Sequence, residues 1–154
     1  MPFDEILSRL TARCSTTELC LSDIRKKLDA TDITEKEKER ILHRLLDEGY
    51  VDEARYARAF VRDKFRFSGW GKVKIAQGLR AKQISSTDIN EALKEIDEDD
   101  YRQTLREALK AKRRSLHEKS DYETNAKLIR FALSRGYEMN VILNEVKASD
   151  DDWE

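Results

Sequence analysis

The sequence contains very few of the residues that build turns. It has one proline, Pro2, and five glycines among 154 residues. A protein made of β-sheets needs more turn residues than this, so we expect an all-α protein. Cysteine is also scarce, and Cys14 and Cys20 lie in a chain without a recognisable secretory signal. We therefore expect both thiols to be reduced and packed within the fold rather than joined in a disulfide.

Long apolar runs are missing as well. No stretch approaches the roughly eighteen apolar residues that a membrane span requires. The first five residues include two acids, which is unlike a targeting signal. These features predict a cytoplasmic protein that does not enter a membrane.

Signatures of catalysis and of metal binding do not occur in the sequence. Its two histidines, His43 and His117, have no cysteine or carboxylate at a metal-ligand spacing. The acidic run at residues 97–100 fits a helix cap followed by solvated residues better than a magnesium site. The sequence also has no glycine-rich phosphate loop and no nucleophile motif. We therefore expect no enzyme activity, no cofactor and no metal.

One apolar spacing occurs three times along the chain. Steps of four and then five residues separate the members of three apolar triplets, namely Ile24, Leu28 and Ile33, then Ile75, Leu79 and Ile84, then Leu128, Ala132 and Tyr137. A period near 50 residues is typical of small helical units that cannot bury their apolar faces alone. We expect an all-α, monomeric protein with three tandem three-helix repeats, similar to helix-turn-helix units, in an elongated and curved array.

The repeats are placed at residues 1–49, 50–97 and 98–148, followed by an acidic tail, 149–154, for which we expect disorder. In the first repeat, a helix buries apolar residues near the N-terminus. The start of the second helix is left open between a capping box at Ser15 and a cap at Ser22. A third helix is expected to begin at Thr34 and to end at Gly49.

Caps and turn residues also divide the later repeats into helices. Asp52 is well placed to cap a helix that reaches about Phe67, and the segment 68–71 then breaks the chain. Ser85 or Ser86 is expected to cap the third helix of that repeat. The other helices are predicted at about 72–82, 101–114, 121–135 and 138–147.

Positive charge is concentrated in the middle of the chain. Residues 55–82 include nine basic residues and one acid, Asp63, which gives this segment a charge of +8. The net charge of the whole chain is −1, so the remaining residues sum to −9. This segregation predicts a polyanionic partner for the middle of the chain.

The basic residues form stripes on the predicted helices. At 100° per residue, four arginines fall within about 80° of one another: Arg55, Arg58, Arg62 and Arg66. We expect these arginines to be exposed because Tyr56, Ala57, Phe60 and Phe67 lie opposite them and should point inward. The third repeat has a looser stripe of Arg102, Arg106, Lys110 and Arg113. A solvated face is the alternative interpretation, but acids are missing from the first stripe, which favours anion or protein binding.

The segment after the first stripe adds further candidates for binding. Trp70 lies between two glycines, where it could stack on a base, anchor an interface or fold back over the core of its own repeat. The basic residues of the following helix complete the candidate set: Lys72, Lys74, Arg80 and Lys82.

The same central segment resembles a known family. Residues 48–57 read Glu-Gly-Tyr-Val-Asp-Glu-Ala-Arg-Tyr-Ala and resemble the Gly-Tyr-Leu-Asp-Asp-x-Arg-Phe run of the bacterial RecX regulators. The likeness continues through residues 60–62, 69–71, 79–84 and 127–137, and it covers about 24–146. Two positions depart from the family pattern: Lys72 replaces the usual proline, and Gln83 stands where glycine is common.

The resemblance implies a small, non-enzymatic negative regulator of the RecA recombinase. Such a protein lodges along the RecA–DNA filament and restrains its growth, ATP hydrolysis and strand exchange, in DNA repair and recombination and in the SOS response. Weak, non-specific affinity for single- or double-stranded DNA is also implied.

The sequence is also compatible with two other functions. The chain could be a stand-alone helix-turn-helix DNA-binding protein that uses residues 72–82 as its recognition helix. It could also be a helical adaptor without any connection to nucleic acid.

Overall fold

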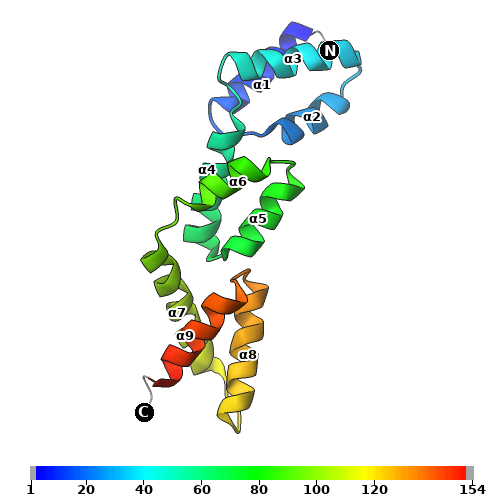
Figure 1. Cartoon of the computed structure of the whole chain (residues 1–154). Helices are drawn as coiled ribbons and strands as arrows, with labels where there is room; N and C mark the ends of the chain where they lie inside the picture. The colour runs from blue at the N-terminus through cyan, green and yellow to red at the C-terminus, as the bar shows by residue number, and fades with distance from the viewer. Residues whose placement is uncertain (1–2, 152–154) are drawn as a thin grey trace. The chain divides into compact units, whose positions relative to one another are not determined.

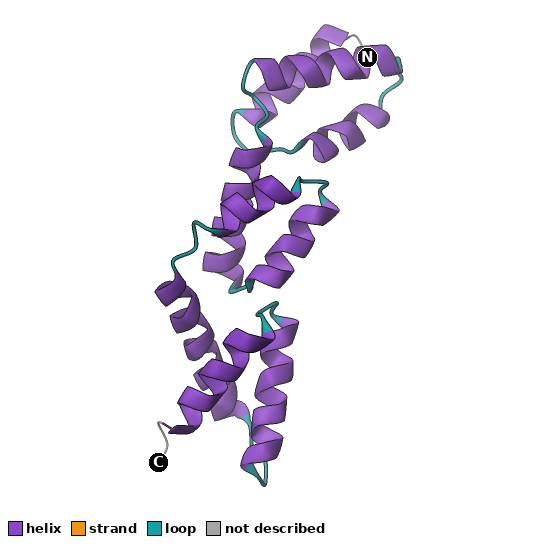
Figure 2. Ribbon diagram, viewed as in Figure 1, coloured by secondary structure: helices purple, strands orange, loops and turns teal. Residues whose placement is uncertain are grey.

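The computed structural model describes residues 3–151, which form helices joined by short turns, with no strand among them (Figure 1; Figure 2). The helices of this range are α1 (Phe3–Cys14), α2 (Leu21–Asp29), α3 (Glu35–Asp47), α4 (Glu53–Ser68), α5 (Lys72–Ala81), α6 (Ser86–Leu93), α7 (Glu98–Ser115), α8 (Asp121–Ser134) and α9 (Met139–Asp151). The predicted all-α fold of three-helix repeats is therefore confirmed. None of the described helices is long and apolar enough to cross a lipid bilayer.

The described residues pack into two compact units. The first contains residues 3–60 and 79–92, and the second contains residues 61–78 and 93–151. Helices α4 and α5 of the middle repeat each contribute one end to each unit. Packing therefore groups the helices differently from the sequence repeats, and the repeat boundaries at residues 49 and 97 stay predictions.

The core of the first unit lies among α1, α2 and α3. Ile24, Leu28, Ile41 and Leu45 are fully buried there. Helix α3 begins one residue after Thr34, where we expected its start. The Thr34 side chain caps it by accepting a hydrogen bond from the backbone N–H of Glu37 in a capping box.

The second helix starts at neither of its two predicted caps. It begins at Leu21, and Cys20 occupies the cap position without a side-chain hydrogen bond to the helix. The backbone N–H of Leu21 is instead 3.4 Å from Glu53 Oε1 on α4. A tertiary contact therefore takes the place of a local cap, which is why the local sequence pattern did not reveal the start.

The core of the second unit lies among α7, α8 and α9. Its fully or almost fully buried side chains include Tyr101, Leu105, Leu109, Leu128, Tyr137 and Ile142. Helix α7 begins three residues earlier than predicted, because the Asp97 side chain caps it by accepting from the N–H of Asp100. Helix α9 continues four residues beyond the predicted end at Lys147, so residues 149–151 are helical where we expected disorder. The rest of the expected tail, 152–154, lies outside the described residues.

The recurring apolar spacing marks buried positions in every repeat. Ile24 and Leu28, Ile75 and Leu79, and Leu128 and Ala132 each have no exposed surface. The spacing therefore reports the face that each repeat buries, as the sequence predicted.

Candidate functional site

The N-terminus of α5 packs against the turn between α8 and α9 within the second unit. The N–H of Gly71 donates to the Arg135 carbonyl at 2.7 Å, and the N–H of Val73 donates to the Gly136 carbonyl at 2.9 Å. Between them, the N–H of Lys72 donates to the Tyr101 hydroxyl at 2.8 Å. These three amides would otherwise be the unsatisfied, anion-attracting groups of a helix start. Their partners come from the protein itself.

Tyr101 connects this contact to the core. Its ring packs against Phe65 and Tyr137 with centroid distances of 5.9 and 5.1 Å. Its hydroxyl accepts from Lys72 N–H and donates to the Glu138 carboxylate. Burial raises the pKa of Tyr101 far above its ordinary value, and the hydrogen bond to Glu138 adds to the shift. Tyr101 is therefore a structural, protonated phenol.

Two lysines that the sequence placed in the binding set take part in this packing. The Lys72 ammonium lies 2.6 Å from Glu98 and 4.6 Å from the centre of the Tyr101 ring. The Lys74 ammonium lies 4.5 Å from the centre of the Trp70 ring, and that of Lys64 lies 4.8 Å from it. Both distances are typical of cation–π contacts. Trp70 is half-buried beneath these ammonium groups.

The first arginine stripe divides into structural and exposed residues. Arg55 is half-buried, with its Nε 2.7 Å from Glu18 and its Nη2 3.2 Å from the carbonyls of Gly49 and Tyr50. Arg58 is also half-buried. The prediction that all four arginines are exposed is therefore wrong for these two, because the helix start packs on the first repeat. Arg62 and Arg66 are exposed.

Phe67 does not point inward as predicted, because 84% of its surface is exposed. Phe65 packs against Tyr101 and takes the inward position of the last turns of α4. A residue two positions further on is rotated by about 200°, so Phe67 faces away from that core. The face of α4 that points inward is not the same at the two ends of the helix. A single helical wheel therefore predicts the buried residues at its start but not at its end. Arg62, Asp63, Arg66 and Phe67 are the exposed residues of the last turns of α4. We call Arg62, Arg66 and Phe67 the α4 surface.

The second stripe is also partly structural. Arg106 lies 2.9 Å and 3.4 Å from the two carboxylate oxygens of Glu145, which is buried on α9. Arg113 is half-buried, with its Nη2 3.4 Å from the side-chain oxygen of Asn125. Arg102 is exposed beside Asp99, at 2.8 Å, and Lys110 is exposed. The stripe is therefore not one continuous basic face.

The last two candidates lie in the first unit. The Lys82 ammonium is 2.6 Å from Asp23 on α2, a pair that holds the end of α5 against α2. Arg80 is exposed. Burial opposes the charged form of Asp23, but its hydrogen bonds with Lys82 and Cys20 and the charge of Lys82 together lower the pKa of Asp23. Lys82 therefore has a structural role.

Side chains for metal chemistry do not gather anywhere in residues 3–151. No group of three or more His, Cys, Asp or Glu side chains in this range could hold a metal ion. Cys14 and Cys20 are free thiols, and burial raises the pKa of both. A thiol with a raised pKa forms less of the reactive thiolate.

Comparison with known proteins gives a consistent result for sequence and fold. Residues 52–93 match the second three-helix domain of RecX, and residues 98–144 match its third. A regulatory protein RecX from Clostridium botulinum (strain Eklund 17B / Type B) is 30% identical over 94% of this chain and 69% of its own length. One from Mycobacterium sp. (strain KMS) is 29% identical over 91% of this chain and 76% of its own length.

Solved structures of the same family share the fold. A crystal structure of RecX from Lactobacillus salivarius superimposes with a TM-score of 0.88 at 18% identity, over 96% of each chain. A crystal structure of a regulatory protein RecX superimposes with a TM-score of 0.82 at 25% identity, over 90% of this chain and 68% of the other. The two domain matches and the similarity to the clostridial protein establish that this chain belongs to the RecX family of regulatory proteins.

Proposed function

We propose that this protein is a negative regulator of RecA that binds the RecA–DNA filament. It restrains filament growth, ATP hydrolysis and strand exchange, and it does so by binding rather than by catalysis. Membership of the RecX family supports this proposal. A partner that works on chromosomal DNA implies a cytoplasmic location and a role in repair, recombination and the SOS response.

The observation that carries the proposal at the level of residues is the α4 surface. Arg62 and Arg66 are exposed, and Phe67 beside them exposes 84% of its surface. Guanidinium groups bind phosphates and carboxylates through their planar donors. An exposed phenylalanine offers a face for stacking or for an apolar contact, and such aromatic anchors are common where binding energy concentrates. We assign this surface to the contact with the filament.

A stand-alone helix-turn-helix protein is less consistent with α5. A recognition helix reads base edges with residues at its N-terminus. In this protein the first amides of α5 are bonded to Arg135, Tyr101 and Gly136. Three of the basic side chains of the 72–82 segment, those of Lys72, Lys74 and Lys82, contact Glu98, Trp70 and Asp23. Little of this helix is left to enter a groove, so any affinity of the protein for bare DNA is expected to be weak.

The test is a titration of the protein into RecA assembled on single-stranded DNA while ATP hydrolysis is followed. We expect inhibition at fewer than one copy per RecA monomer, because one bound copy can block growth of a whole filament end. A protein without regulatory function, or an adaptor unrelated to RecA, leaves the rate unchanged even at a several-fold excess. Equal binding to bare duplex and to filament would support the stand-alone DNA-binding alternative.

The α4 surface is tested by the double variant Arg62→Glu with Arg66→Glu. A matched control is Arg114→Glu with Arg130→Glu, which reverses two other exposed arginines and changes the net charge equally. If the α4 arginines contact phosphates, each contributes roughly 0.7–0.9 to the log–log salt slope of binding. We expect the α4 variant to lose inhibition and salt dependence and the control to keep both. Equal behaviour of the two variants would contradict the assignment.

A further inference from the structure

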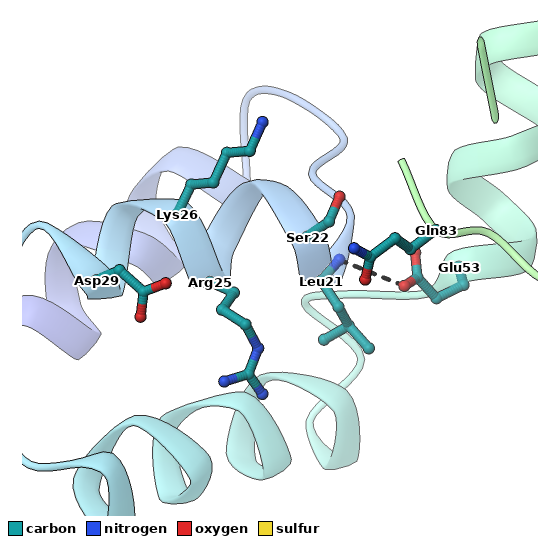
Figure 3. Close-up of a pocket in the computed structure, with 7 residues that line it drawn as sticks. All are labelled: Leu21, Ser22, Arg25, Lys26, Asp29, Glu53 and Gln83. Carbon is teal, nitrogen blue, oxygen red and sulfur yellow. Dashed lines mark hydrogen bonds between the residues drawn. The ribbon is translucent and has the colours of Figure 1, made fainter. Parts of the chain in front are cut away.

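A pocket of about 440 Å³ lies within the first unit, between α2, the first turn of α4 and the turn from α5 to α6 (Figure 3). Its lining residues are Leu21, Ser22, Arg25, Lys26, Asp29, Glu53 and Gln83. In Figure 3 the side chains of Glu53 and Gln83 come together beside Leu21, at one end of the pocket. None of the candidate binding residues from the sequence lines this pocket.

Glu53 is the lining residue whose bonding is incomplete. Its Oε1 accepts from the N–H of Leu21 at 3.4 Å, which is a weak hydrogen bond. Its Oε2 is buried and has no hydrogen-bond partner among the residues that the structure describes. A buried carboxylate oxygen without a donor carries a desolvation cost, and a donor in the pocket would remove this cost once the Glu53 carboxylate turns toward it.

The charges around Glu53 favour a cation. Burial raises the pKa of Glu53, and the carboxylates of Asp88, Asp23 and Asp52 raise it further. Asp23 is paired with Lys82 at 2.6 Å. Asp52 accepts from the N–H of Arg55 as the cap of α4. Within residues 3–151, Glu53 itself accepts only from the backbone N–H of Leu21, so a cation beside it would favour its charged form.

The cations that line the pocket do not neutralise Glu53. Arg25 is bonded to Glu39 on α3 at 2.6 Å. Figure 3 shows the Lys26 side chain extending away from Glu53. Asp29, at the other end of the pocket, already accepts from Lys38 at 3.2 Å. The pocket thus has one carboxylate that lacks a cationic partner.

A comparison of the repeats explains why this space is open. Gln83 comes just before Ile84, the last member of its apolar triplet, and Gly136 comes just before Tyr137, the last member of the corresponding triplet. Gln83 and Gly136 both have a positive φ, 62° and 92°. At Gly136 the absence of a side chain lets the turn bond directly to the N-terminus of α5. At Gln83 a side chain stands at the corresponding place, and the N-terminus of α2 reaches the Glu53 carboxylate instead. Gln83, one of the two residues that depart from the family pattern, is therefore one of the residues that line the pocket.

We propose that this pocket binds the guanidinium group of an arginine side chain from a protein partner. The planar donors of a guanidinium match both oxygens of a carboxylate, which an ammonium cannot do. The terminal torsion of a glutamate is soft, so the Glu53 carboxylate can turn toward the incoming group. The Ser22 hydroxyl and the Gln83 amide supply further polar atoms in the lining. A metal ion is a poor alternative, because no metal-binding group of side chains occurs in the described residues.

The proposed function enters this inference only through the identity of the partner, which would be RecA. The binding of a guanidinium by the pocket can be measured without RecA. The two steps are therefore tested separately.

The first experiment titrates methylguanidinium into the full chain and follows the amide resonances of Leu21, Ser22 and Gln83 by NMR. We expect saturable shifts at these residues, and no such shifts with N-methylurea, a neutral molecule of similar shape. Glu53→Gln should abolish the saturable shifts, while Glu5→Gln, an identical change at an exposed position, should preserve them. Shifts that do not saturate, that N-methylurea reproduces or that survive Glu53→Gln would overturn the proposal.

A second variant protects the result against misfolding. Gln83→Gly suits a positive φ, so the fold should persist, and it removes one wall of the pocket. We expect this variant to lose the methylguanidinium shifts while its helical circular dichroism is unchanged. If Gln83→Gly keeps the saturable methylguanidinium shifts, the pocket lined by Gln83 is not the guanidinium site.

The partner is tested in the filament assay. Glu53→Gln should weaken binding to the RecA filament at least about tenfold, as expected for loss of one partner of a buried charged pair. Unchanged filament binding by Glu53→Gln, with methylguanidinium binding lost, would overturn the assignment to RecA. If the unmodified chain fails to bind the filament at all, the proposed function fails, and the methylguanidinium titration still decides whether the pocket is a guanidinium site.

Discussion

Gly136 and Lys74 approach so closely that a Cβ on Gly136 would lie 2.6 Å from the backbone nitrogen of Lys74. The contact joins the turn between α8 and α9 to the first turn of α5, beside the hydrogen bond from Val73 to the Gly136 carbonyl. Gly136 also has a φ of 92°, in the left-handed region that favours glycine. Glycine at this position therefore serves both the conformation of the turn and the packing of the second unit.

Replacing this glycine should be more costly than replacing another glycine with a positive φ. Gly136→Ala should lower the free energy of unfolding by about 2–4 kcal/mol, from left-handed strain plus overpacking against Lys74. Gly49→Ala is the matched control, because Gly49 has a φ of 78° but no atom within 4 Å of an added Cβ. Its cost should be about 1–2 kcal/mol. Urea unfolding followed by circular dichroism measures both, and equal losses would contradict the packing role of Gly136.

The two stripe residues Arg106 and Lys110 should differ in their effect on stability. Arg106→Ala leaves the buried Glu145 carboxylate without its cation, so we expect a loss of about 1–3 kcal/mol, reduced from the fully buried case because Arg106 is partly exposed. Lys110→Ala removes an exposed side chain and should change the free energy of unfolding by no more than about 0.5 kcal/mol. A small effect of Arg106→Ala in urea unfolding would mean that its pair with Glu145 contributes little.

The buried tyrosines predict a loss of stability at high pH. Burial raises the pKa of Tyr137 to about 12 and that of Tyr101 further. Unfolded tyrosines ionise near pH 10, so above this pH the unfolded chain releases protons that the folded protein retains. The contribution of these tyrosines to the free energy of unfolding should therefore be constant below about pH 10. It should fall as the pH rises toward 12.

Urea unfolding between pH 8 and pH 11.5, with tyrosinate absorbance followed in parallel, checks this expectation. Tyr137→Phe should show a shallower decline than the unmodified protein, because one of the shifted groups is then missing. A folded protein whose buried tyrosines ionise at the same pH as free tyrosine would contradict the prediction.

Exposed aromatic residues offer a matched pair for the proposed filament contact. Phe67→Ala should weaken binding to the RecA filament about tenfold, as expected for an aromatic anchor at an interface, without loss of stability. Tyr122→Ala is the control, since Tyr122 is 82% exposed on α8 and Phe67 is 84% exposed on α4. Filament binding measured by fluorescence anisotropy separates the two variants. Similar weakening by both would indicate a general effect of exposed aromatics rather than a defined contact.

Helix content and the buried face of each repeat could be predicted from sequence because they depend on local patterns. Thr34 caps α3 and Asp52 caps α4 through side chains that reach amides only three residues away. The failures have a shared origin. Arg55 and Arg106 were assigned to binding stripes, but they pair with Glu18 and Glu145, which are 37 and 39 residues distant in sequence.

A helical wheel has no information about such distant partners. It also assumes that one face of a helix stays inward along its whole length, which does not hold for Phe67 at the end of α4. The pocket at Glu53 was missed for the same reason, because its lining comes from three separate segments. The only sequence signal for it was Gln83, where the family usually has glycine.

The amino-acid sequence alone determines that this protein is helical, that it is built from repeated three-helix units and that its central segment carries the family pattern. These properties follow from periodicity, caps and glycine positions, all of which act over a few residues. Only the tertiary structure decides which charges are available to a partner. A guanidinium or carboxylate is available or occupied according to what packs beside it, and here Arg62 is exposed, Arg106 is paired and the half-buried Glu53 has one buried oxygen without a donor.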